Sequence, residues 1–246
     1  MQLSYNETSL PGTTGAERLQ LARQCGVALE IANDGSTTAD RYQNIGLPIT
    51  AVQAYLMHEF HPLHLEPAHR QQATTHLHQT LELAAQVAAP RVITACGFGQ
   101  HLADRPFERA LDFFNAIAPA AKSWGIRVMI EPLSPRRAAA LTDPAQIAAL
   151  IEALNQPEVF ALVLDTGHLS DSGFDLDTFF RHWSHPIKEL QLKGAASAPP
   201  SADWPLASWI DSLPSPPAVA CVEHRQPIGQ EDCLALTAAL QRALAV

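Results

Sequence analysis

The sequence has little positive charge and no long hydrophobic run. Its 16 Lys and Arg residues are outnumbered by 25 Asp and Glu residues, and the formal net charge at pH 7 is −9. Nucleic-acid binding depends on a basic stripe or patch, so we expect no nucleic-acid partner. No apolar stretch is long enough to cross a bilayer, so we expect no membrane partner either.

Cysteine is also scarce, and glycine-rich nucleotide-binding loops are missing. The four cysteines show neither disulfide nor zinc-site spacing: Cys25, Cys96, Cys221 and Cys233. With no signal peptide before the first expected strand, this predicts buried thiols in a cytoplasmic protein. The turn at 6–15 lacks the Gly-x-Gly-x-x-Gly pattern of dinucleotide-binding folds, which disfavours an open doubly wound sheet.

What the chain does have is a regular alternation of apolar strand-like runs and amphipathic helical patterns. The runs lie at 3–6, 27–33, 49–56, 91–97, 126–131, 160–167, 187–194 and 218–224. Eight such units in 246 residues fit a (β/α)₈ TIM barrel, which typically has ~250 residues. We therefore predict an α/β fold with a single TIM-barrel domain over 1–246.

Helix boundaries support this division of the chain. Asp143 followed by Pro144 predicts the start of a helix, because Asp caps helix N-termini and Pro fits the first turn. Gly26 and Gly125 follow helical patterns and are predicted to end them.

Four oxygen-bearing side chains stand at or near the ends of the last four runs: Glu131, Asp165, Gln191 and Glu223. The catalytic face of a TIM barrel is formed by the carboxyl ends of its strands. Three carboxylates meeting there would repel one another unless they bind protons or a cation. An all-oxygen set favours Mg²⁺ or Mn²⁺ over Zn²⁺. A single strand-ending acid could instead cap a helix or form a salt bridge, and Gln191 could simply hydrogen-bond a neighbour.

Four motifs in the second half of the chain carry a family resemblance. They are IEPLSP at 130–135, LDTGHLSDSG at 164–173, IKELQLKG at 187–194 and VACVEHR at 219–225. These motifs resemble the strand ends of the xylose isomerase-like TIM barrels, which include sugar isomerases and epimerases, dehydratases and the family 2 AP endonucleases. The resemblance implies Glu131, Asp165 and Glu223 as acidic metal ligands, with Glu131 and Glu223 also as the acid/base pair. It further implies that His168 contacts or deprotonates the substrate.

The sequence departs from the family pattern at its seventh strand. Gln191 and Gly194 stand where the family has His-x-x-Asp or His-x-x-Glu, and the loop APPSADW at 198–204 replaces a Pro-Gly-x-Gly signature. Glutamine in the ligand position resembles some 3-dehydroshikimate dehydratases. The endonuclease branch would need several strand-end histidines that are not in place.

Four further residues are candidates for substrate binding. Glu30 is expected to end the second strand, where it could bind a substrate hydroxyl or cap a helix. His58 follows the third strand, where it could contact a substrate, although a solvated loop is the simpler explanation. Arg70 offers a bidentate fork for a carboxylate or phosphate. Lys193 lies two residues after Gln191 and therefore shares its face of the strand.

These observations predict a divalent-metal-dependent isomerase or epimerase of a small sugar or keto-polyol. Proton transfer through an enediolate would use Glu131 and Glu223. Two alternatives remain open: a metal-dependent dehydratase of a cyclic keto acid or inosose with His168 as base, and a non-catalytic barrel without metal. The expected partner is a small sugar or keto acid, and a homo-oligomer is left open.

Overall fold

A computed structural model describes residues 1–95, 97–98 and 104–245. Its eight parallel strands form a closed barrel in the order β1 to β8, which confirms the predicted (β/α)₈ fold. The strands are β1 (Gln2–Asn6), β2 (Ala28–Asn33), β3 (Ile49–Ala54), β4 (Arg91–Thr94), β5 (Arg127–Ile130), β6 (Phe160–Asp165), β7 (Glu189–Leu192) and β8 (Val219–Val222).

Helices follow the strands along the chain. The α-helices are α1 (Gly15–Cys25), α2 (Pro67–Gln86), α3 (Pro106–Trp124), α4 (Pro144–Leu154), α5 (Thr166–Asp171), α6 (Leu176–His182), α7 (Leu206–Ser212) and α8 (Gln230–Leu244). Short 3₁₀ helices lie at η1 (Glu7–Ser9), η2 (Ala39–Tyr42), η3 (Tyr55–His58) and η4 (Ala195–Ser197). The chain divides into two compact units, so the predicted single domain stays a prediction. Unit 1 comprises Met1–Ile31, Ile45–Thr50 and Leu164–Val246, and unit 2 comprises Ala32–Asn44 and Ala51–Val163.

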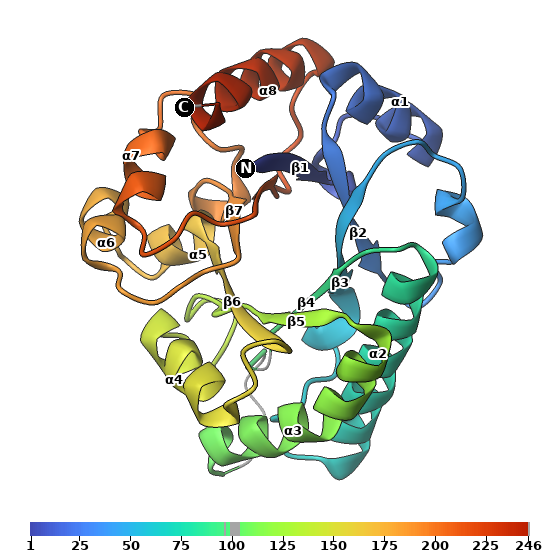
Figure 1. Cartoon of the computed structure of the whole chain (residues 1–246), viewed down its shortest axis with the longest axis vertical. Coiled ribbons are helices and arrows are strands. Elements are labelled where there is room, and N and C mark those ends of the chain that lie inside the picture. The colour runs from blue at the N-terminus through green and yellow to red at the C-terminus, as the bar shows by residue number, and fades with distance from the viewer. Residues whose placement is uncertain (96, 99–103, 246) are drawn as a thin grey trace. The chain divides into compact units, whose positions relative to one another are not determined.

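Unit 1 joins the two ends of the chain. β1 pairs in parallel with both β2 and β8, and β7 pairs with β8, with Gln191 opposite Cys221. α8 packs against α1 and β1, and Figure 1 shows α8 in red beside α1 in blue. These pairings bring the carboxyl ends of β7 and β8 together, which is where two of the predicted site residues lie.

Unit 2 is built on β4, which pairs with β3 and with β5. Its strands contribute a buried apolar cluster: Ala51, Ile93, Met129, Ala161 and Val163. α2 and α3 pack against each other outside the strands (Figure 1). Burial of strands on both faces explains why their sequences read as continuous apolar runs.

The helix boundaries follow the sequence signals. Asp143 caps α4 through a capping box with Gln146, and Pro144 is its first residue. Gly26 and Gly125 end α1 and α3 in the left-handed conformation, at φ of 63° and 64°, which glycine adopts without the steric cost of a Cβ.

The expected position of Glu30 was wrong. β2 continues to Asn33, where the apolar run at 27–33 also ends, so Glu30 lies within the strand rather than at its end. α2 begins at Pro67, which places Arg70 in the first turn of this helix, just after the preceding loop.

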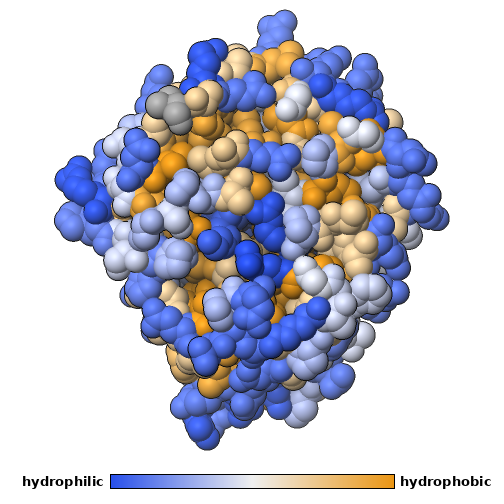
Figure 2. Space-filling model, in the orientation of Figure 1, coloured by the Kyte–Doolittle hydropathy of each residue, from blue (hydrophilic) through white to orange (hydrophobic). Residues whose placement is uncertain are grey.

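The composition led us to expect no membrane-spanning segment and buried cysteine thiols. On the face seen in Figure 2, hydrophilic residues form most of the outer edge and hydrophobic residues are interspersed among them. Over the described ranges, no helix combines the length and hydropathy that a membrane span requires. Cys25, Cys221 and Cys233 are buried free thiols, and Cys96 lies outside the described residues.

Candidate active site at the ends of β6, β7 and β8

The end of β6 fixes the direction of one carboxylate. Asp165 is both the last residue of β6 and the N-cap of α5. Its Oδ1 accepts hydrogen bonds from the backbone N–H groups of Gly167 and His168, at 2.7 and 3.0 Å. The side chain is almost fully buried. The remaining oxygen, Oδ2, is therefore the one that Asp165 can offer to another group.

The two residues after Asp165 tie this turn to β7. The hydroxyl of Thr166 donates to the carbonyl oxygen of Lys193 and accepts from the Lys193 N–H, both at 2.8 Å. Gly167 lies directly against Lys193: a Cβ there would stand 2.8 Å from Lys193 Cγ and 2.8 Å from the carbonyl oxygen of Gly194. The sequence DTG thus holds a carboxylate and leaves space for the lysine beside it.

Strand β7 turns alternate residues to the interior of the barrel. Glu189 and Gln191 are fully buried, and Lys193, just after the strand, is 5% exposed. The amide of Gln191 donates from Nε2 to Glu30 Oε1 at 3.2 Å. Its Oε1 is buried and makes no hydrogen bond within the described part of the chain. An amide oxygen in this state is a candidate ligand for a cation.

Lys193 places its ammonium among the carboxylates. Its Nζ lies 2.5 Å from Asp165 Oδ2 and 4.0 Å from Glu223 Oε2. The side chains of all three residues are at most 8% exposed. At this burial the attraction between charges is screened far less than at a surface. The sequence had suggested Lys193 as a substrate-binding cation, whereas in the structure its nearest partners are the acids.

The end of β8 supplies the second carboxylate of this cluster. Glu223 follows β8 directly, and its N–H donates to the carbonyl oxygen of Leu192 at 3.1 Å, which continues the β7–β8 pairing. Its Oε1 accepts from Arg225 Nη2 at 3.4 Å. We refer to Asp165, Gln191, Lys193 and Glu223 together as the strand-end cluster.

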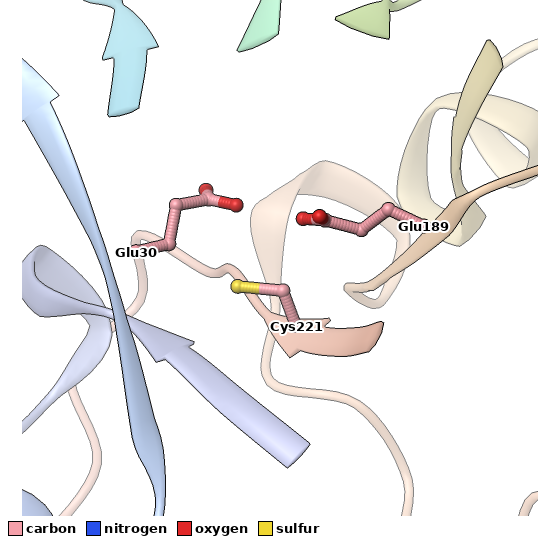
Figure 3. Close-up of side chains that lie close together, drawn as sticks. All are labelled: Glu30, Glu189 and Cys221. Carbon is pink, nitrogen blue, oxygen red and sulfur yellow. The ribbon is translucent and has the colours of Figure 1, made fainter. Parts of the chain in front are cut away.

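A second group of buried acids lies next to this cluster. In Figure 3 the carboxyl groups of Glu30 and Glu189 point toward each other, with the Cys221 sulfur beside them. One oxygen of Glu30 accepts from both Asn6 and Gln191, each at 3.2 Å. Burial, and then the charge of Glu189, raise the pKa of Glu30 well above its usual value. Glu30 also links β2 to Gln191 through this hydrogen bond.

Sequence reasoning missed Glu189, Cys221 and Thr166. The alternation of residues 189, 191 and 193 on one strand face was a usable signal for Glu189. Thr166 had no such signal, because its contacts join two strands that are distant in sequence. Gly194 stands where the family resemblance predicts an acidic residue, and its surroundings explain why a glycine fits there. A Cβ at this position would lie 2.9 Å from the carbonyl oxygen of Pro199.

The other predicted site residues are placed as follows. His168 is buried in α5, next to the Asp165 turn. Glu131 belongs to unit 2, where it follows β5, is partly buried, and donates its N–H to the carbonyl oxygen of Thr94 at 2.9 Å. Its meeting with the other three predicted ligands stays a prediction.

Two substrate-binding candidates in unit 2 have local contacts of their own. His58 lies in η3 with an exposed side chain, and its Nδ1 is 2.8 Å from the carbonyl oxygen of Tyr55. Arg70 donates from Nη1 to the carbonyl oxygens of His64 and Leu65, at 2.6 and 2.7 Å. These contacts favour a structural role for Arg70, which connects α2 to the preceding loop.

The strand-end cluster fits a hard divalent cation in its donor chemistry. Asp165 and Glu223 offer carboxylate oxygens, and Gln191 offers a buried amide oxygen that accepts no hydrogen bond from the residues that the structure describes. Oxygen donors of these kinds are the ligands that Mg²⁺ and Mn²⁺ prefer. Lys193 is the feature that a metal would have to accommodate, because its ammonium already compensates part of the negative charge.

Comparison with known proteins extends over the whole fold. An AP endonuclease of family 2 from Brucella melitensis matches 96% of this chain and 98% of its own, with a TM-score of 0.79 and 19% identity. The 3-keto-D-glucoside 4-epimerase of E. coli covers 100% of both chains with a TM-score of 0.76 and 13% identity. The IOLI protein, solved with a bound zinc atom, covers 100% of this chain and 98% of its own with a TM-score of 0.75 and 14% identity.

At these identities the structures show a shared fold. A search of the curated proteins found no match. The sequence itself matches the family described as xylose isomerase-like TIM barrel over residues 19–243, which is most of the chain. The protein therefore belongs to the xylose isomerase-like TIM barrel family.

Proposed function

We propose that the protein is a metal-dependent isomerase or epimerase of a small polyhydroxy carbonyl compound. The observation that carries this proposal is the strand-end cluster, in which Asp165 and Glu223 both lie near the buried ammonium of Lys193, and the buried Gln191 stands two residues before that lysine. Catalytic residues of TIM barrels come from such strand ends. Sugar epimerases among the similar structures support the substrate class.

Asp165, Gln191 and Glu223 would hold the cation, with Glu131 of unit 2 as a further ligand. A bound Mg²⁺ or Mn²⁺ would polarise a substrate carbonyl and stabilise negative charge that develops on its oxygen. Asp165 is suited to act as a metal ligand and not as an acid or base. Its Oδ1 accepts two hydrogen bonds from the backbone of α5, which leaves Oδ2 for the cation. Gln191 is oriented by its hydrogen bond to Glu30.

Proton transfer falls to the glutamates in this proposal. Glu223 follows β8 directly, with one oxygen 4.0 Å from Lys193 Nζ and the other 3.4 Å from Arg225 Nη2, and a positioned carboxylate of this kind can act as a general base. It would remove the proton next to the carbonyl, and Glu131 would return a proton to the other carbon or the other face. His168 would contact the substrate.

A dehydratase is the second candidate, and the amide ligand Gln191 favours it. There His168 would remove the proton, and loss of a hydroxyl would give a conjugated product. The two reactions differ in the residue on which they depend and in the light absorption of their products.

The experiment follows both signals with Mn²⁺-loaded protein in D₂O and panels of ketoses, inososes and 3-dehydroshikimate. Deuterium uptake next to the carbonyl without new ultraviolet absorbance supports the isomerase or epimerase. We expect this uptake to fall about 10²–10⁴-fold in Glu223→Gln and much less in His168→Asn. New absorbance that His168→Asn abolishes would replace this proposal with the dehydratase. No signal from any panel member would favour a barrel without catalysis.

A further inference from the structure

We propose that Lys193 is a resident cation of the strand-end cluster, and that a divalent metal ion binds only by displacing its ammonium from Asp165. The inference rests on the metal site of the proposed function and concerns how that site is filled. It makes Lys193 a residue that sets metal affinity, and not a substrate contact.

The position of Lys193 is determined by its surroundings along its whole length. Its backbone N–H and carbonyl oxygen are both held by the Thr166 hydroxyl. Its side chain passes over Gly167, where a Cβ would approach Lys193 Cγ and Cε to 2.8 and 2.9 Å. The side chain is only 7% exposed, so it is packed within the protein and does not extend from a solvated surface. The packing directs its ammonium to the carboxylates.

The ammonium and a metal ion would need the same oxygen. Asp165 Oδ1 already accepts two backbone N–H groups, so Oδ2 is the oxygen left for a cation. Lys193 Nζ lies 2.5 Å from that Oδ2. A Mg²⁺ or Mn²⁺ ligated by Oδ2 would stand about 2.0–2.3 Å from that oxygen. An ammonium that contacts the same oxygen would lie close to the metal ion, and the two positive charges would repel each other. The two cations therefore compete for this oxygen of Asp165.

The charge of the cluster leads to the same conclusion. Both carboxylates, Asp165 and Glu223, lie within 4.0 Å of the Lys193 ammonium, and Glu223 also lies 3.4 Å from Arg225. Carboxylates as buried as Asp165 need a compensating cation. Lys193 supplies it for Asp165 when no metal is bound, which stabilises the metal-free protein and weakens its affinity for metal.

The test measures Mn²⁺ binding through the electron paramagnetic resonance signal of free Mn²⁺, without any substrate. Lys193→Met keeps an unbranched side chain over Gly167 and removes the charge. We expect it to bind Mn²⁺ about tenfold more tightly than the wild type, or better. Lys122→Met is the matched control, because Lys122 pairs with Glu158 at 3.2 Å on the exposed surface, and its affinity should equal that of the wild type.

Thermal unfolding gives a second readout from the same proteins. Metal-free Lys193→Met should unfold at a lower temperature than the wild type, and saturating Mn²⁺ should raise its unfolding temperature by more than it raises that of the wild type. Lys193→Gln, which retains a polar group, serves for the same comparison if the Met variant does not fold.

The outcomes separate this inference from the proposed function. Equal or weaker Mn²⁺ binding by both Lys193 variants overturns the displacement, while the metal site and the isomerase proposal stand. Tighter binding supports the displacement even if the deuterium experiment finds no substrate. If neither the wild type nor any variant binds Mn²⁺, both the displacement and the metal-dependent reaction are overturned.

Discussion

Replacing Thr166 with valine should destabilise the protein, because its hydroxyl connects the Asp165 turn to β7. The side chain is fully buried and makes two 2.8 Å hydrogen bonds to the backbone of Lys193. Valine has nearly the same shape but can neither donate nor accept. Losing one partner of a buried hydrogen bond costs about 1–3 kcal/mol, so the two bonds together predict a loss of about 2–6 kcal/mol.

Urea unfolding followed by tryptophan fluorescence measures this loss. For a chain of this size the same change should lower the melting temperature by roughly 4–24 °C. Thr166→Ser is the matched control, since it keeps the hydroxyl and should lose at most about 1 kcal/mol through the missing methyl group. A valine variant as stable as the serine variant would refute the role given to this hydroxyl.

Three further changes test other parts of the structure. Burial lowers the pKa of His76 from 6.5 to about 4, so stability should be complete above pH 6.5 and fall by up to about 3 kcal/mol as the pH drops toward 4. Urea titrations of His76→Gln should show a shallower fall, and an identical pH profile would contradict this. The raised pKa of Glu30 has the opposite sign: stability present below its unfolded value of 4.5 is lost as the pH rises toward the folded value. Glu30→Gln should therefore gain stability over the wild type with rising pH, and a constant difference would count against a raised pKa of Glu30. Gly167→Ala should cost about 1–3 kcal/mol by overpacking, whereas Gly229→Ala, whose Cβ would meet its nearest atom at 3.4 Å, should be nearly neutral; equal melting temperatures would argue against the close packing of Lys193.

The barrel could be predicted because each strand is a short apolar run and each connection carries its own capping residues. Asp143 and Gly125 act locally, through bonds and dihedral angles within a few residues, so their effects are readable from the sequence. The position of Asp165 at a strand end was readable for the same reason. Its capping bonds to α5 also agree with the alternative considered for strand-ending acids, and capping occupies just one of its two oxygens.

The contacts of the site were not readable in this way. Glu30 and Gln191 are 161 positions apart in the sequence. Their hydrogen bond forms because both side chains, one on β2 and one on β7, point into the barrel interior. The spacing of Lys193 from Gln191 predicted which face of the strand Lys193 occupies. It did not predict which group the Lys193 ammonium contacts. Whether a lysine on that face reaches a substrate or a neighbouring carboxylate depends on the room that Gly167 leaves for its side chain.

The most direct test of the central claim, that the strand-end cluster carries out metal-dependent proton transfer, is deuterium uptake in Glu223→Gln with bound Mn²⁺ verified in the same sample. The substrate is the panel compound on which the wild type is most active. The account predicts that wild-type protein incorporates solvent deuterium next to the carbonyl and that the variant, with Mn²⁺ still bound, is slower by about 10²–10⁴-fold. Uptake at the wild-type rate in the metal-loaded variant would contradict it.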